Sequence, residues 1–280
     1  MSERFSVRNE LQKFSNLNDC QETTRYRLWQ VFANHEVLTH NNNVTRYDIV
    51  EDLLSYFGRE YKMEYNSSDH RKNISELKKY ICHECEWYHV YDFVEKYLKS
   101  KNNSESTKRI INEFNDVLED EQTGYHIIHN LITPITNPTE IEEIEKVIEI
   151  VPEHVEKSIK KSLELFSKKP TPDYNNAIKE IITAVEALCC TIVAESGEDA
   201  DTLGKAVNKL SSCGIVLNEH LKTAIKELYK YTCNEDGKRH GGTTFVESSA
   251  EDARFMIVTC SAIINYLMVK RDSVKEGSAT

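Results

Sequence analysis

Two residues able to do acid–base and phosphate chemistry stand side by side in the stretch NEDGKRHGG, residues 234–242. His240 titrates near neutral pH and can serve as a base or an acid, while the guanidinium of Arg239 suits a phosphate group. Asp236, in the same stretch, is an acid with which Arg239 could pair. The pair is therefore either a catalytic site or two polar residues on a turn, and the residues around it help to distinguish these alternatives.

Helical patterns lie on both sides of this stretch. Apolar residues at helical spacing end at Tyr231, and a new pattern begins at Ser248 or Ser249. The roughly sixteen residues between them show no period, and such long connections inside compact domains are usually functional or disordered. This segment is therefore the candidate site of the C-terminal half.

Two carboxylates are candidate supports for the pair. Glu186 lies on the polar side of a helix predicted over 173–196, and Asp252 lies at the start of the last helix. Each could orient His240 or pair with Arg239, or each could belong to a solvated or salt-bridged face together with Lys179.

The C-terminal half has the periodicity of a helical bundle. Apolar residues recur every three or four positions, which predicts six helices. Asp173 can cap the start of the helix over 173–196 and Gly197 its end, and Ser249 with Asp252 forms a near capping box for the last helix. That helix, to about Lys270, has little polar face and is expected to be the central and most buried one, paired mainly with the helix over 173–196.

The N-terminal half is also mainly helical. Helices are expected over 25–32, 47–58, 74–99 (one long or two short) and 110–118. The stretch 124–136 then turns to β-branched residues around His129-Asn130, which predicts a small hairpin. The fold class is thus mainly α, with domains at 1–135 and 136–272 and a disordered tail at 273–280.

Composition excludes several classes of protein. A net charge of −11 with 39% hydrophobic residues indicates a globular chain without a broad basic face for nucleic acid, although a small local site stays open. The N-terminus lacks the apolar core of a signal peptide, and no run approaches the length of a bilayer span. We therefore expect a cytoplasmic protein with no membrane partner.

Weak metal patterns occur in the N-terminal half. Cys82 and Cys85, followed by His89, have ligand types that suit zinc, but a single C-x2-C is half a site and simple burial explains the cysteines as well. His126 and His129, three apart, are expected at the surface. We expect no metal and no cofactor; Cys189-Cys190 are expected core thiols, and TLGK (202–205) a helix start rather than a phosphate loop.

Several stretches together resemble the AbiJ-type abortive-infection proteins, whose C-terminal part is a HEPN-like helical domain. They are RYRLWQVF (25–32), GYHIIHNLITPIT (124–136), PDYNNAIKEIITAVEALCCTI (172–192), DTLGKAVNKL (201–210), IKELYKYT (225–232), DGKRHGG (236–242) and AEDARFMIVTCSAIINYLM (250–268).

This resemblance implies a C-terminal HEPN-like bundle, commonly a homodimer, in a bacterial response to phage. Active HEPN proteins are metal-independent ribonucleases, whose usual motif is an arginine and a histidine with four to six residues between them. Such cleavage needs a base, an acid and a cation at the phosphate. The resemblance places this role on Arg239 and His240, supported by Asp236, Glu186 and Asp252.

The sequence departs from that motif, because the residues five, six and seven before His240 are Glu235, Asn234 and Cys233. Two functions therefore stay open. One is a ribonuclease or toxin acting on RNA; the other is a catalytically silent module for dimerisation and for sensing a phage or host protein.

Overall fold

The computed structural model describes the chain except for residues 1–17, 38–46, 62–66, 103, 234–246 and 279–280. Contacts divide the chain into two compact units between Thr136 and Asn137, which we call unit 1 (1–136) and unit 2 (137–280). The described residues form 11 α-helices, one short π-helix and one two-stranded hairpin, so the predicted mainly α fold is confirmed.

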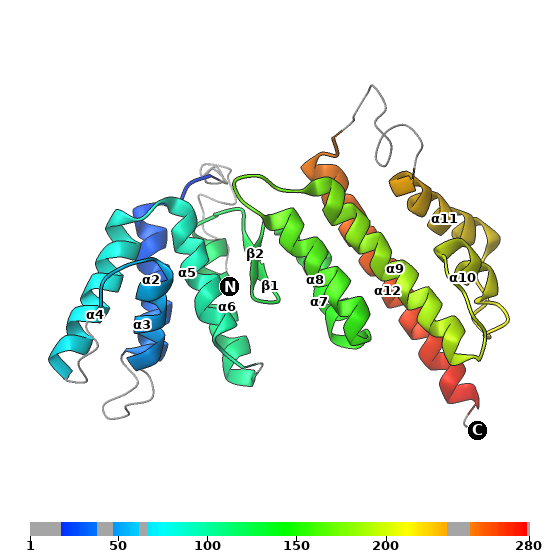
Figure 1. Cartoon of the computed structure of the whole chain (residues 1–280), viewed down its shortest axis with the longest axis horizontal. Helices are drawn as coiled ribbons and strands as arrows, with labels where there is room; N and C mark the ends of the chain where they lie inside the picture. The colour runs from blue at the N-terminus through cyan, green and yellow to red at the C-terminus, as the bar shows by residue number, and fades with distance from the viewer. Residues whose placement is uncertain (1–17, 38–46, 62–66, 103, 234–246, 279–280) are drawn as a thin grey trace. The chain divides into compact units, whose positions relative to one another are not determined.

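Unit 1 is a set of helices closed by a hairpin (Figure 1). Its elements are α2 (Glu22–Glu36), α3 (Tyr47–Tyr56), α4 (Ser67–Lys79), the π-helix η2 (Tyr80–Glu84), α5 (Trp87–Lys99), α6 (Glu105–Asp120), β1 (His126–Ile128) and β2 (Leu131–Thr133). Its core is rich in aromatic rings, with Phe32 of α2 edge-on to Phe93 and Tyr97 of α5 at centroid distances of 5.1 and 5.0 Å. These contacts fix α2 against α5.

The hairpin forms where the sequence predicts it. His129 and Asn130 both have positive φ, 50° and 64°, and join strands in which Ile128 faces Leu131 and Ile127 faces Ile132. Two positive-φ residues in a two-residue loop match the twist of antiparallel strands, and asparagine tolerates that conformation well. Local turn chemistry therefore sets this register.

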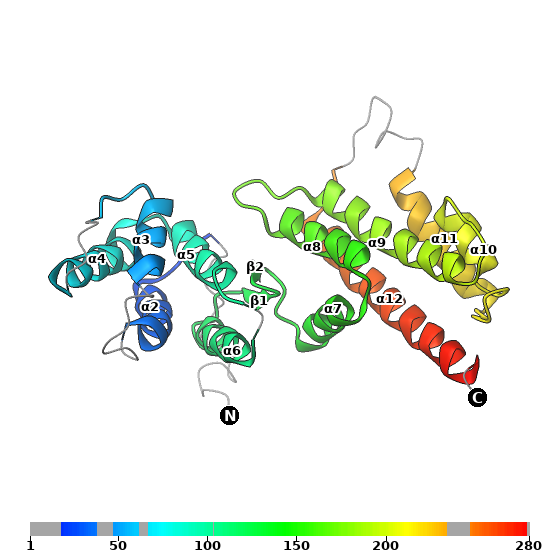
Figure 2. The same cartoon turned by 60° about the horizontal axis from the view of Figure 1, so that its bottom comes forward.

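Unit 2 is all helical. It contains α7 (Pro138–Ile150), α8 (Glu153–Ser167), α9 (Tyr174–Glu195), α10 (Leu203–Lys209), α11 (Glu219–Cys233) and α12 (Ala250–Ser278). Helix α9 packs most extensively against α8 and then against α12, and it also contacts α10 and α11 (Figures 1 and 2). The central helix of the unit is therefore α9, whereas the sequence pattern favours the last helix for that place.

The predicted helix ends of unit 2 are confirmed where caps define them. The Asp173 side chain accepts a hydrogen bond from the backbone N–H of Asn176 at 3.2 Å, and Gly197 follows α9 with φ of 81°. Ser249 and Asp252 form the reciprocal capping box, with N–H to oxygen distances of 2.9 and 3.1 Å. Each cap pairs N–H groups that have no partner inside the helix.

Helix α12 differs from its prediction in length and in burial. It continues to Ser278, past the expected end at Lys270 and through 273–278, which the sequence analysis assigns to a disordered tail. Its stretch Ala250–Glu276 is long and apolar enough to cross a membrane by length and composition, with half of the tested window buried in unit 2. The sequence-based expectation that no run is long enough to span a bilayer is therefore wrong. A core helix of a globular unit meets the same criterion.

Candidate functional site

The connection between α11 and α12 carries the predicted catalytic pair. Arg239, His240 and Asp236 all fall in 234–246 and so lie outside the described residues. The structure does describe the two helices on either side of this connection, α11 and α12.

The exit of the connection is fixed to the first turn of α9. Both the backbone N–H and the hydroxyl of Ser248 donate to the side-chain oxygen of Asn175, at 3.2 and 2.8 Å. Ser248 is buried, and the capping box formed by Ser249 and Asp252 begins at the next residue. Asp252 therefore lies at the exit of the connection, as expected, with a helix-capping role of its own. Asn175 is a contact that the sequence analysis did not single out.

Glu186 has a structural partner elsewhere on α9. Its carboxylate accepts the backbone N–H of Leu203 at 2.7 Å, at the start of α10. Eleven residues separate it from Asn175, which corresponds to about 16 Å along a helix rising 1.5 Å per residue. The described geometry thus places Glu186 as a cap for α10. The same helix start carries Thr202, which accepts the N–H of Lys205 at 3.4 Å, so TLGK opens a helix as predicted.

The cysteine pair of unit 1 is built into the core. Cys82 and Cys85 are both buried, and the Cys85 thiol donates to the Ile81 carbonyl. Burial raises the pKa of the Cys82 thiol to about 11, so the thiolate that zinc requires is disfavoured. Among the residues that the structure describes, no group of three His, Cys, Asp or Glu side chains could hold a metal ion.

The histidines near these patterns have other partners. His89 Nδ1 lies 2.8 Å from the Tyr80 hydroxyl, and His83 Nε2 lies 2.6 Å from the Tyr26 hydroxyl. His126 is half-buried rather than a surface residue, with Nε2 3.1 Å from the Asn115 amide. Burial lowers the pKa of His126, which favours its neutral ring.

Arg25 ties α2 to the π-helix. Its Nε donates to the Cys20 carbonyl at 3.0 Å, and its Nη1 donates to the carbonyls of Cys85 and Ile81 at 2.7 and 3.3 Å. A cation suits the carbonyl end of a helix, and the planar fork reaches several acceptors at once. Arg25 therefore positions η2.

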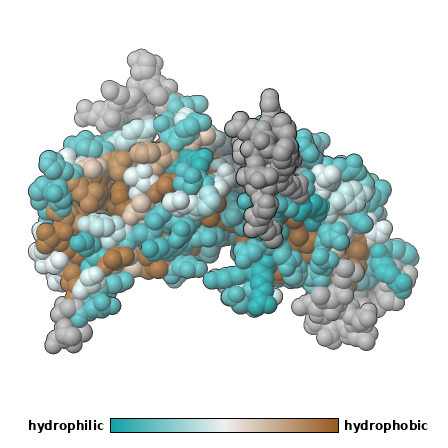
Figure 3. Space-filling model, turned by 180° about the vertical axis from the view of Figure 1, so that it is seen from behind, coloured by the Kyte–Doolittle hydropathy of each residue, from teal (hydrophilic) through white to brown (hydrophobic). Residues whose placement is uncertain are grey.

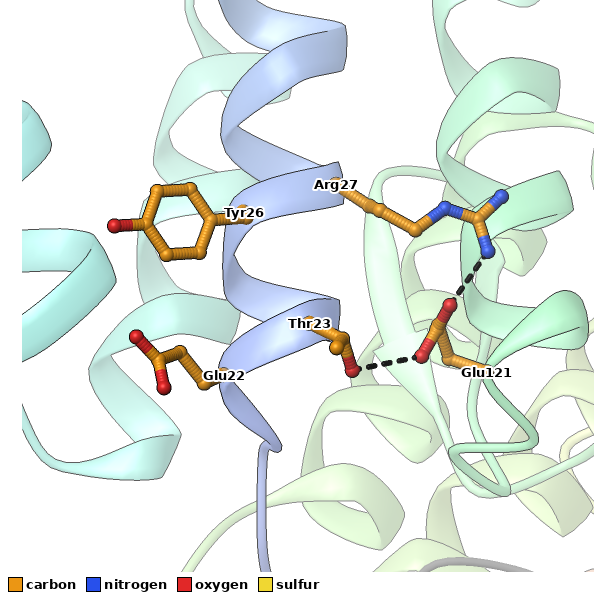
Figure 4. Close-up of a pocket in the computed structure, with 5 residues that line it drawn as sticks. All are labelled: Glu22, Thr23, Tyr26, Arg27 and Glu121. Carbon is orange, nitrogen blue, oxygen red and sulfur yellow. Dashed lines mark hydrogen bonds and ion pairs between the residues drawn. The ribbon is translucent and has the colours of Figure 1, made fainter.

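The open hollow beside α2, about 540 Å³ in volume, is lined by Glu22, Thr23, Tyr26, Arg27 and Glu121. Figure 4 shows Tyr26 and Glu22 on one side of α2, and Thr23, Arg27 and Glu121 on the other. Arg27 and Thr23 are both bonded to Glu121, at 2.6 and 3.0 Å. Because these side chains diverge or pair with one another, the hollow offers no convergent set of groups to a ligand.

Comparison with known proteins identifies one family. Residues 3–150 match the model of AbiJ N-terminal domain 4, which ends with α7. The match stops short of α8 and gives no evidence on a HEPN domain in residues 151–280. No curated protein and no solved structure matches the chain.

Proposed function

The chain belongs to the AbiJ N-terminal domain 4 family, an abortive-infection family, and on that premise we propose that it is a phage-defence protein whose unit 2 is a HEPN-like ribonuclease or toxin acting on RNA. The family match over residues 3–150 is the observation that carries this proposal, because it implies phage defence. The ribonuclease part rests on the resemblance of residues 172–268 and on the all-helical fold of unit 2.

In this proposal, the chemistry is metal-independent. His240 removes the 2′-hydroxyl proton or protonates the leaving 5′-oxygen, and Arg239 stabilises negative charge on the phosphate oxygens. Ser248, held by Asn175, supports this role because it fixes one end of the connection that carries both residues. The net charge of −11 limits RNA contact to a local site.

A second function comes from a different class. No arginine stands five, six or seven residues before His240, and this departure favours a catalytically silent unit 2 that associates with itself and senses a phage or host protein. The proposed partners are thus a second copy, RNA at a local site, and a trigger protein. In either case the protein acts in the cytoplasm.

RNA cleavage in EDTA separates the two functions. Purified full-length protein should cut RNA without a divalent metal, and His240→Ala and Arg239→Ala should each lose that activity. His220→Ala is the matched control, because His220 is an exposed histidine of the same unit on α11. Equal activity in His240→Ala and wild type would reject the catalytic assignment, and an inactive wild type that still protects cells from phage would favour the silent module.

A further inference from the structure

The exposed hydrophobic side chains of unit 1 are tyrosines. Seen from behind, hydrophobic surface gathers over unit 2, whereas unit 1 shows a mainly hydrophilic face (Figure 3). Among the described residues of unit 1, the large hydrophobic side chains with an exposed surface are Tyr26, Tyr56 and Tyr88, at 37%, 52% and 41%. Tyrosine combines an apolar ring with a polar hydroxyl, and it is enriched where proteins bind other proteins. These three residues are therefore the candidates for a binding surface on unit 1.

Tyr56 and Tyr88 belong to one row of aromatic rings. Tyr56 is the last residue of α3 and Tyr88 lies in the first turn of α5, and the two helices pack side by side (Figures 1 and 2). The centroid of the Phe57 ring lies 4.9 Å from that of Tyr56 and 5.6 Å from that of His89. The His89 ring in turn lies 4.6 Å from Tyr88. The row is therefore continuous, with an exposed tyrosine at each end.

The hydroxyls of these two tyrosines are free to bind another molecule. Neither the Tyr56 nor the Tyr88 hydroxyl has a hydrogen-bond partner in the part of the chain that the structure describes. The hydroxyl of Tyr26, in contrast, lies 2.6 Å from His83 Nε2 and is already engaged. Tyr56 and Tyr88 thus offer both a ring and a hydroxyl, and Tyr26 offers mainly its ring.

Asp92 lies beside the row and has no partner. It is half-buried and follows Tyr88 by four residues, so the two side chains are neighbours on one face of α5. Burial raises the pKa of Tyr56, and the charges of Asp92 and Glu95 raise it further, which sets Asp92 close to Tyr56 as well. Glu95, one turn later, accepts the backbone N–H of Ile132 at 2.9 Å. Asp92 makes no hydrogen bond or ion pair with any described residue.

A half-buried carboxylate without a partner is unfavourable when it is charged. Burial raises the pKa of Asp92, although the charges of His89 and Lys99 lower it. A cation from another molecule, bonded directly to the carboxylate, would offset the cost of removing Asp92 from water. Asp92 is therefore suited to pair with a cation that the chain itself does not supply.

Cations already lie over the rings in this part of unit 1. Lys96 Nζ lies 5.4 Å from the centroid of the Tyr56 ring, and the guanidinium of Arg59 lies 4.8 Å from that of Tyr80. Lys96 follows Asp92 by four residues, in the order that favours an ion pair within a helix, yet it lies over Tyr56 instead. The Tyr56 ring thus attracts a cation, and the carboxylate of Asp92 stays available.

We propose that Tyr56, Tyr88 and Asp92 form a site for an arginine side chain presented by a partner protein. A guanidinium is planar, so it can stack on a tyrosine ring and direct two N–H groups to one carboxylate, which an ammonium cannot do. The net charge of −11 favours a basic partner. This site, which we call the arginine site, rests on the proposed sensing of a phage or host protein and needs no ribonuclease activity.

Tryptophan fluorescence of the full-length protein tests the arginine site. The Trp87 ring lies 5.7 Å from Tyr88, whereas Trp29, the other tryptophan, is buried. An acetylated, amidated tetra-arginine peptide should change the emission in a saturable way at about 150 mM salt. It should bind at least about fivefold more tightly than the tetralysine peptide of equal charge, because only the guanidinium both stacks and forks.

Matched variants separate the charge from the ring. Asp92→Asn should weaken binding of the arginine peptide by about tenfold, and Tyr56→Ala by about threefold to fivefold. Tyr56→Phe keeps the ring and should bind within about twofold of wild type. Asp116→Asn, at an exposed acid of α6, and Tyr26→Ala are the controls, and neither should change the affinity.

Three outcomes are decisive. Equal affinity for the two peptides, or equal losses in Asp92→Asn and Asp116→Asn, would indicate a general attraction to an acidic protein and would overturn the arginine site. A change in emission caused by an oligouridylate but not by the arginine peptide would assign the rings to RNA bases and would also overturn it. Wild type that binds the arginine peptide as expected but gives no protection from phage would reject the defence proposal and leave the arginine site in place.

Discussion

The bonds of Arg25 give a quantitative test of how unit 1 is held together. Replacing Arg25 with alanine removes two short hydrogen bonds to the carbonyls of Cys20 and Cys85 and a longer one to Ile81. A hydrogen bond to a charged group contributes about 1.5–3 kcal/mol. Because Arg25 is half-buried and water replaces part of what is lost, we expect a fall of about 2–4 kcal/mol in the free energy of unfolding of unit 1.

The same helix offers a matched control. Arg27 also makes two charged contacts, with Asp120 and Glu121 at 2.7 and 2.6 Å, but it is 36% exposed and Asp120 44%. Exposed ion pairs contribute about 0–1 kcal/mol, so Arg27→Ala should lower the free energy of unfolding by less than about 1 kcal/mol. Arg25→Lys keeps the charge without the planar fork and should fall between wild type and Arg25→Ala.

Tryptophan fluorescence during urea unfolding measures these changes in the intact protein. The two tryptophans of the chain, Trp29 and Trp87, both belong to unit 1, so the signal reports that unit alone. Free energies follow from the transition midpoints and slopes. If Arg25→Ala lowered the free energy of unfolding no more than Arg27→Ala, Arg25 would not hold η2 in place.

Three further predictions follow from single contacts. Asn115→Leu should lower the free energy of unfolding of unit 1 by about 2–3 kcal/mol in the same fluorescence assay, because it leaves the backbone N–H of Ile127, bonded at 2.8 Å, without an acceptor. Glu186→Ala should cost unit 2 about 1 kcal/mol by circular dichroism, because the N–H of Leu203 loses its acceptor, whereas Glu186→Gln should cost less. RNA cleavage lost in Glu186→Gln at unchanged stability would argue for a catalytic role instead. Burial lowers the pKa of His126 in the folded protein below the value of about 6.5 in the unfolded chain. Between these two pKa values the unfolded chain binds more protons than the folded one. The free energy of unfolding of unit 1 should therefore fall as the pH drops below about 6.5 toward the folded pKa. His126→Gln should reduce that slope between about pH 7.5 and 5 in urea titrations, and an unchanged slope would exclude this origin.

Local signals made much of the fold predictable. The caps at Asp173 and Ser249 depend on residues within three positions of each other, and the hairpin turn depends on His129 and Asn130 themselves. Helical periodicity likewise reports which face of a segment is apolar. Features encoded within one or two turns of the chain could therefore be predicted from the sequence.

The features that escaped prediction depend on distant partners. Arg25 bonds to carbonyls 56 and 60 residues away, and no pattern in α2 indicates them. Glu186 finds its partner 17 residues ahead, across a helix end. Hydropathy also does not tell which apolar residues are covered by neighbouring helices, so the exposure of Phe255 does not follow from the sequence pattern. For Arg239 and His240 the sequence gives the place of a candidate site, because their aperiodic stretch lies between two periodic helical patterns.

Because of the π-helix, the number of residues between α4 and α5 cannot change without moving the residues that follow. Its closing bond joins the N–H of Cys85 to the carbonyl of Tyr80, five residues back, at 2.9 Å. Such a turn holds one residue more than an α-helical turn. Deleting one residue from 80–84 would let an ordinary helix form, but it would rotate every later side chain by about 100° and carry the carbonyl of Cys85 away from Arg25. Relatives with an arginine at the position of Arg25 should therefore also keep the extra residue of the π-helix. Relatives that lack this arginine should lack the extra residue too.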